Sequence, residues 1–180
     1  MQLKAIATNL IKFNRIATLL AVGITVSIGL PALAGVLWTP GKSGTLPRNA
    51  VVGGSQNGTK LYVCQAIHDG EYTPGKIAAP NYKYCYIPWG GKEYHYTKYR
   101  VLTGNNWKWI NFQSSWKKLP NDRVWGGNED NGKNTLYVCR AILSTGYAPG
   151  KYYPPNKICY VSYGGLEYQY KSYFQILTAK

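Results

Sequence analysis

The chain has 180 residues and a formal net charge of +14. A charge of this sign favours anionic surfaces such as acidic polysaccharides, lipid headgroups or phosphate-bearing envelope polymers, although it equally serves to keep a tyrosine-rich surface soluble. After the first 34 residues no segment is apolar and long enough to be expected to cross a bilayer, which argues against stable membrane insertion.

Residues 1–34 are predicted to be a cleaved secretory signal. Three basic residues precede an apolar run over residues 16–30, and Pro31-Ala32-Leu33-Ala34 ends in a small-x-small pattern. The alternative is an uncleaved membrane anchor, but the run is shorter than the ~20 residues that a spanning helix needs. Cleavage after Ala34 predicts a secreted, periplasmic or cell-surface protein, for which nucleic acid is not an expected partner.

The rest of the chain contains an internal duplication, in which more than half of the aligned positions are identical. Three segments recur in the same order: Leu61–Ile67 as Leu136–Ile142, Pro74-Gly75-Lys76 as Pro149-Gly150-Lys151, and residues 81–99 as residues 156–173. A duplication of this kind predicts two copies of one structural unit. We place the two units at residues 35–104 and 105–180.

Both units are expected to be built from β-strands. Segments rich in Tyr, Val and Ile, or alternating with period two, lie at residues 60–67, 84–89 and 94–96 in the first copy and at 136–142, 158–163 and 168–170 in the second. Turns are predicted at Gly53-Gly54, Asn57-Gly58, Pro74-Gly75 and Gly90-Gly91 and at Gly126-Gly127, Asn131-Gly132, Pro149-Gly150 and Gly164-Gly165. The connector over residues 104–116 carries three tryptophans and is expected to pack against the body. The sequence therefore predicts an all-β fold of two tandem antiparallel units.

Four cysteines in an exported chain indicate disulfides. Three connectivities are possible, but a unit that existed before its duplication is expected to bond within itself. The predicted pairs are therefore Cys64 with Cys85 and Cys139 with Cys159. A zinc site is disfavoured because the chain has no Cys-x-x-Cys pair.

The order of these motifs resembles the DM9 repeat, also called DUF3421. The motifs are Gly-Gly, Leu-Tyr-Val-Cys-x-Ala, Pro-Gly-Lys, Cys-Tyr, Gly-Gly-x-Glu and a closing Tyr with Leu, and they occur in this order over about residues 36–103 and again over 106–178. The resemblance implies that the two repeats pack as one all-β unit with pseudo-twofold symmetry. It also implies a secreted lectin that recognises mannose, with one sugar site in each repeat.

The resemblance further implies which residues hold the sugar. In this family the lysine of Pro-Gly-Lys, here Lys76 and Lys151, acts with an acidic residue just after Gly-Gly. That position is Gln56 in the first copy and Glu129, followed by Asp130, in the second. An ammonium that donates and a carboxylate that accepts can hold two neighbouring sugar hydroxyls. Gln56 departs from the pattern because an amide accepts without a charge, and the simpler alternative for Pro-Gly-Lys is a turn with a solvated lysine.

Supporting roles are predicted for four further residues. Glu93 and Glu167 recur at equivalent positions, although a carboxylate at a strand edge can equally pair with a nearby lysine. Tyr72 and Tyr147 precede the lysines and are expected to lie exposed beside them.

No enzymatic activity and no cofactor or metal is expected, because neither histidine has a counterpart in the other copy and no nucleophile motif occurs. Two functions remain. One is a lectin-like protein that binds glycans or cell-surface polysaccharide. The other is a basic envelope or surface protein that is held to anionic polymers by charge alone. The oligomeric state is open, and a homodimer is one of the states considered.

Overall fold

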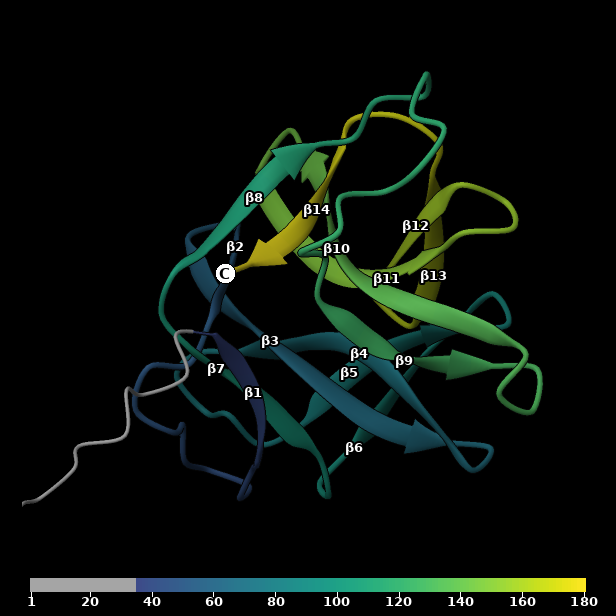
Figure 1. Ribbon diagram of the computed structural model, residues 1–180. Helices are drawn as coiled ribbons and strands as arrows, with labels where there is room; N and C mark the ends of the chain where they lie inside the picture. Colours follow the sequence, from purple (N-terminus) through teal and green to yellow (C-terminus); the bar gives the residue numbers. More distant parts are fainter. Residues whose placement is uncertain (1–34) are drawn as a thin grey trace, which may run out of the picture. The chain divides into compact units, whose positions relative to one another are not determined.

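Residues 35–180, the part of the chain that the computed structural model describes, form fourteen β-strands and no α-helix (Figure 1). The all-β prediction is thus confirmed. Because this described part contains no helix, it holds no helical segment that could cross a membrane. The predicted signal over residues 1–34 lies outside the described residues.

The strands form two sets of seven. The first set is β1 (Val36–Pro40), β2 (Val52–Gln56), β3 (Thr59–His68), β4 (Glu71–Ala78), β5 (Cys85–Trp89), β6 (Lys92–Tyr96) and β7 (Arg100–Gly104). The second set is β8 (Trp107–Asn111), β9 (Trp125–Glu129), β10 (Asn134–Leu143), β11 (Gly146–Tyr153), β12 (Ile158–Tyr163), β13 (Leu166–Tyr170) and β14 (Phe174–Ala179). Each strand of the first set corresponds to the strand seven numbers later.

The order of the strands shows the same symmetry. Along the sheet it runs β1-β7-β3-β4-β5-β6 and then β13-β12-β11-β10-β14-β8, so the second half mirrors the first. The two halves meet where Leu166 of β13 pairs with Lys92 of β6. The pairing is antiparallel throughout, as predicted.

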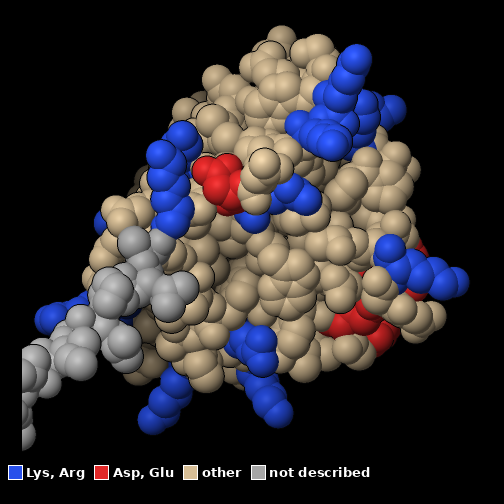
Figure 2. Space-filling view, viewed as in Figure 1, with Lys and Arg blue, Asp and Glu red and all other residues tan. Residues whose placement is uncertain are grey.

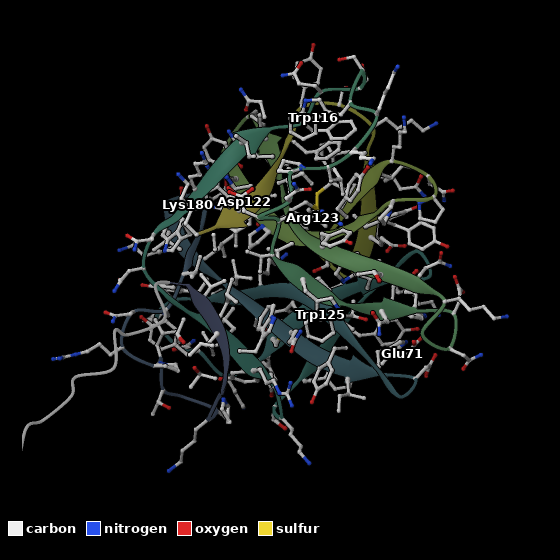
Figure 3. All side chains as sticks on the ribbon, viewed as in Figure 1. Glu71, Trp116, Asp122, Arg123, Trp125 and Lys180 are labelled. Carbon is white, nitrogen blue, oxygen red and sulfur yellow. A yellow bond between two sulfur atoms is a disulfide. The ribbon has the colours of Figure 1, made fainter. Side chains whose placement is uncertain are left out.

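The second strand of each half also contacts the other half. Strand β2 pairs with β11 through Gln56 and Gly146, and β9 packs against β4. In Figure 1 the green strand β9 accordingly lies among the blue strands of the first half. The carboxylate of Glu71 accepts hydrogen bonds from the backbone N–H groups of Asn131 and Gly132, at 3.2 and 2.6 Å, in the turn that follows β9 (Figure 3). The two copies are therefore interlocked rather than merely adjacent.

Three apolar clusters hold the sheet together. One belongs mainly to the first half and one mainly to the second. The third takes three buried residues from each copy: Val51, Val63 and Leu102 with Val124, Val138 and Leu177. Burial of branched side chains from both copies in one cluster stabilises the two halves as a single unit.

The disulfides have the predicted connectivity. Cys64 bonds to Cys85 and Cys139 to Cys159, and each bond joins the third strand of a copy to its fifth. All four cysteines are buried. The described residues contain no free cysteine.

Several predicted turns are strands in the structure. The Asn-Gly pairs and the Gly90-Gly91 and Gly164-Gly165 pairs do form turns. In contrast, Gly53-Gly54 and Pro74-Gly75 lie inside β2 and β4, and their counterparts lie inside β9 and β11. These predictions were wrong because glycine in a strand also permits close backbone approach, which sequence alone does not distinguish from a turn. The connector does pack against the body, since it contains β8, which pairs with β14.

Candidate functional site

The two lysines of the Pro-Gly-Lys motif project from the interiors of β4 and β11. Lys76 and Lys151 are 5% and 4% exposed, so neither is the solvated turn lysine of the simpler alternative. A Cβ atom on the preceding Gly75 would overlap the carbonyl oxygen of Tyr86 on the neighbouring strand. Glycine at this position therefore lets β4 and β5 approach closely, and Tyr86 pairs directly with Lys76.

The ammonium group of Lys76 contacts one carboxylate and one carbonyl. Its Nζ atom lies 3.1 Å from Oε1 of Glu93 and donates a hydrogen bond to the backbone carbonyl of Ser162. It also lies 5.6 Å from the centre of the Tyr163 ring. Burial lowers the pKa of Lys76 below its ordinary value, and Glu93 offsets part of this shift. The Lys76 ammonium is thus largely desolvated, with a single carboxylate beside it.

A cavity of about 360 Å³ opens beside Lys76. We call it the Lys76 pocket, and it is lined by Gln56, Asn57, Thr59, Leu61, Lys76, Ala78, Tyr86, Glu93, Tyr163 and Gly164. Burial, and to a lesser extent the charge of Glu93, raises the pKa of Tyr86 above its ordinary value. The pocket therefore combines an ammonium, a carboxylate and two amides with the phenol rings of two tyrosines.

The ammonium group of Lys151 lies close to two carboxylates and an aromatic ring. Its ammonium donates to Glu129 and lies 3.6 Å from Oε1 of Glu167. The Trp89 ring covers it, with the ring centre 4.4 Å from Nζ. The side chains of Glu129 and Glu167 are only 14% and 5% exposed. We refer to Lys151, Glu129, Glu167 and Trp89 as the Lys151 cluster; it brings together the lysine and acidic residue that the family resemblance implies.

Both sites are assembled from the two copies together. The backbone N–H of Gly165 donates to Oε2 of Glu93 at 3.0 Å, and that of Gly91 donates to Oε2 of Glu167 at 2.7 Å. Both glycines have positive φ angles, 83° for Gly91 and 86° for Gly165, which favour glycine. Each glutamate next to a lysine is therefore oriented by a turn from the opposite copy, so the recurrence of Glu93 and Glu167 has a structural reason.

Three of the predicted residues lie elsewhere. The Asp130 carboxylate accepts from the Tyr153 hydroxyl at 3.0 Å and from the Asn134 amide, and its side chain is exposed. The rings of Tyr72 and Tyr147 lie beneath guanidinium groups, those of Arg100 and Arg140, at 4.2 and 4.1 Å. Neither tyrosine lines the Lys76 pocket.

Sequence reasoning missed the aromatic rings at the two lysines. Tyr163 lies over Lys76 and Trp89 over Lys151, and each comes from the other copy. Both residues immediately precede a Gly-Gly pair, so an aromatic residue at equivalent positions of the duplication was the available signal. That signal could not be assigned to a lysine without knowing how the copies interlock.

Comparison with known proteins is consistent with this architecture. Two stretches of the chain, residues 30–95 and 56–170, match the family model described as DM9 repeat. Natterin-4 of Thalassophryne nattereri is 28% identical over 137 residues, which cover 73% of this chain and 31% of Natterin-4. The chain thus spans about a third of the length of that relative.

A solved structure extends the comparison to the fold. The crystal structure of the nematode sperm cell motility protein MFP2B matches with a TM-score of 0.59 and 19% sequence identity. The match covers 81% of this chain and 47% of the MFP2B chain. At this identity the likeness concerns the fold alone.

Proposed function

Since the chain belongs to the DM9 repeat family, we propose that it is a lectin-like protein and that the Lys76 pocket is its main sugar site. The observation that carries this proposal is the cavity in which a buried lysine, a glutamate and a glutamine converge beneath the ring of Tyr163. Small-molecule sites are typically concave, with a few polar groups that fix orientation. The cavity of about 360 Å³ is at the small end of the usual range for such sites, which suits one sugar ring.

The polar groups of the pocket complement a pair of sugar hydroxyls. A hydroxyl both donates and accepts, so Lys76 can donate to one sugar oxygen while Glu93 accepts from its neighbour. Gln56 adds an amide that does either. Tyr163 is 47% exposed, which leaves its ring available to cover the apolar face of a pyranose. No step of this scheme requires catalysis, and the proposed activity is binding alone.

Mannose is the first sugar to test, because the family resemblance implies it. Export accords with the two disulfides, which are typical of proteins that fold in an oxidising compartment. The proposed ligand is therefore a glycan that the protein meets outside the cytoplasm.

A glycan array probed at low and at high salt tests the proposal. We expect binding to mannose-containing glycans that persists at high salt, and that falls at least about tenfold in the variant Lys76→Met. The matched control is Lys98→Met, which removes the same charge from an exposed position. Equal glycan binding by the two variants would contradict a sugar site at Lys76.

Binding to anionic polymers by charge is the second candidate. It is favoured by the net charge of +14. Figure 2 shows lysine and arginine side chains at several separate places around one face, with acidic side chains confined to small areas. Such binding is expected to weaken steeply with salt and to resist competition by free mannose, whereas lectin-like binding behaves in the opposite way.

A further inference from the structure

A second cavity adjoins the Lys76 pocket. It has a volume of about 270 Å³, and we name it the Leu143 cavity; it is lined by Gln56, Leu143, Ser144, Thr145, Ala148, Val161, Tyr163, Tyr168 and Tyr170. We propose that it is a second sugar subsite, so that the protein binds a neutral oligosaccharide of at least two units across both cavities. This inference rests on the proposed function and specifies the class of glycan that is bound.

The two cavities share two of their lining residues. Gln56 and Tyr163 line both the Lys76 pocket and the Leu143 cavity, so these side chains lie between the two spaces. A sugar ring in each cavity would contact the same amide and the same phenol ring. The glycosidic bond between two consecutive sugars would therefore cross Gln56 and Tyr163.

The lining of the Leu143 cavity suits an uncharged sugar. It contains no acidic or basic side chain, while Ser144, Thr145 and the tyrosines offer hydroxyl groups. Tyr163 and Tyr168 are 47% and 41% exposed, which is high for aromatic rings of this size. Exposed rings beside hydroxyl groups match the mixed apolar and polar faces of a pyranose.

The duplication shows why this cavity is open. The residues at positions equivalent to Leu143, Tyr163 and Tyr168 in the other copy are His68, Trp89 and Tyr94. There the imidazole is 9% exposed, and its centre lies 4.4 Å from the Tyr94 ring and 4.9 Å from the Trp89 ring. His68 Nδ1 also lies 2.5 Å from the Tyr96 hydroxyl. An imidazole thus packs among the aromatic rings next to the Lys151 cluster, whereas leucine at the equivalent position leaves a cavity.

Chain length of the ligand is the variable that tests this inference. Calorimetry would compare methyl α-mannoside with α-linked mannobiose and mannotriose on the purified protein. We expect affinity to rise about tenfold from the monosaccharide to the disaccharide as the second cavity becomes occupied. The variant Leu143→His, which places the residue of the other copy in the cavity, is expected to lose this gain and to keep its monosaccharide affinity within about twofold.

Two further variants control for folding and volume. Leu143→Met keeps an apolar side chain of similar volume and is expected to keep the gain. Tyr168→Ala removes an exposed ring and is expected to reduce the gain even if Leu143→His does not fold. Monosaccharide binding without any gain, or a full gain in both Leu143→His and Tyr168→Ala, overturns the second subsite and leaves the proposed function standing. If the unmodified protein binds none of the three mannosides, both the second subsite and the proposed function are overturned.

Discussion

The Lys76 pocket and the Lys151 cluster lie at equivalent positions of the two copies, but the side-chain contacts of their lysines differ. In both, a buried lysine lies beside a glutamate that a glycine of the opposite copy orients. At Lys151 a second carboxylate, Glu129, takes the ammonium and Trp89 covers it. At Lys76 the equivalent residue is the uncharged Gln56, which lines an open cavity. A recurring motif therefore marks equivalent positions without implying equivalent sites.

The two sites also differ in charge. The Lys151 cluster has one positive charge and two negative charges within a mostly buried space, so two carboxylates share a single ammonium. Glu167 Oε1 lies 3.6 Å from that ammonium and has no hydrogen-bond partner. The Lys76 pocket has one charge of each sign and two neutral amides. A ligand hydroxyl that approaches Lys76 competes with one carboxylate and the Ser162 carbonyl rather than with two carboxylates. We therefore propose a mainly structural role for the Lys151 cluster and propose the Lys76 pocket as the stronger candidate for a sugar site.

Removal of each lysine is expected to change the stability of the protein more than any other substitution at the two sites. Lys151→Ala would leave Glu129 and Glu167 buried near each other without a cation. Breaking a buried ion pair typically costs about 3–5 kcal/mol, and we expect a loss of this size in the free energy of unfolding, measured by urea denaturation. Lys76→Ala would leave one carboxylate, that of Glu93, and the Ser162 carbonyl without the ammonium, so we expect about half that loss.

A combined variant isolates the cause. Adding Glu129→Gln and Glu167→Gln to Lys151→Ala removes both unpaired charges and is expected to recover most of the lost stability. Equal losses for the two single lysine variants would mean that the second carboxylate does not distinguish the sites.

How much of this could be predicted from sequence depends on whether a feature is local. Strand content follows from runs such as Leu61–Ile67, and the disulfide pairing follows from the duplication, because both depend on residues within one copy. The position of Tyr163 over Lys76 depends on how the two copies interlock. No local pattern encodes that arrangement.

The Pro-Gly-Lys motif is a second feature whose structure cannot be predicted from the local sequence. Pro followed by Gly is typical of a turn, so the sequence alone predicts a turn at Pro74-Gly75. In the structure Gly75 instead admits the backbone of Tyr86, and the lysine points into a buried site. The tertiary neighbour, rather than the dipeptide, decides between the two outcomes.

The two disulfides, in contrast to the two lysines, are expected to stabilise their copies equally. The paired double variants are Cys64→Ala with Cys85→Ala, and Cys139→Ala with Cys159→Ala. The bonded cysteines are 21 and 20 residues apart, so each bond is expected to contribute about 3 kcal/mol by restricting the unfolded chain. Urea denaturation should show nearly equal losses. A large difference between the two pairs would show that the scaffolds themselves, and not only the sites, have diverged.

The smallest expected effect comes from giving the Lys76 pocket the acceptor of its counterpart. In Gln56→Glu the new carboxylate is expected to pair with the Lys76 ammonium, as Glu129 pairs with Lys151. The free energy of unfolding should rise by less than about 1 kcal/mol, because the position is only partly buried. Affinity for methyl α-mannoside in calorimetry should fall about threefold to tenfold, since the fixed carboxylate competes with a sugar oxygen for the ammonium.

Gln56→Asn, which keeps an amide but shortens it, controls for loss of the glutamine contact itself. A rise in affinity in Gln56→Glu would reverse the comparison, because it would show that the acidic acceptor binds the sugar and that the Lys151 cluster, which already has one, is the better site.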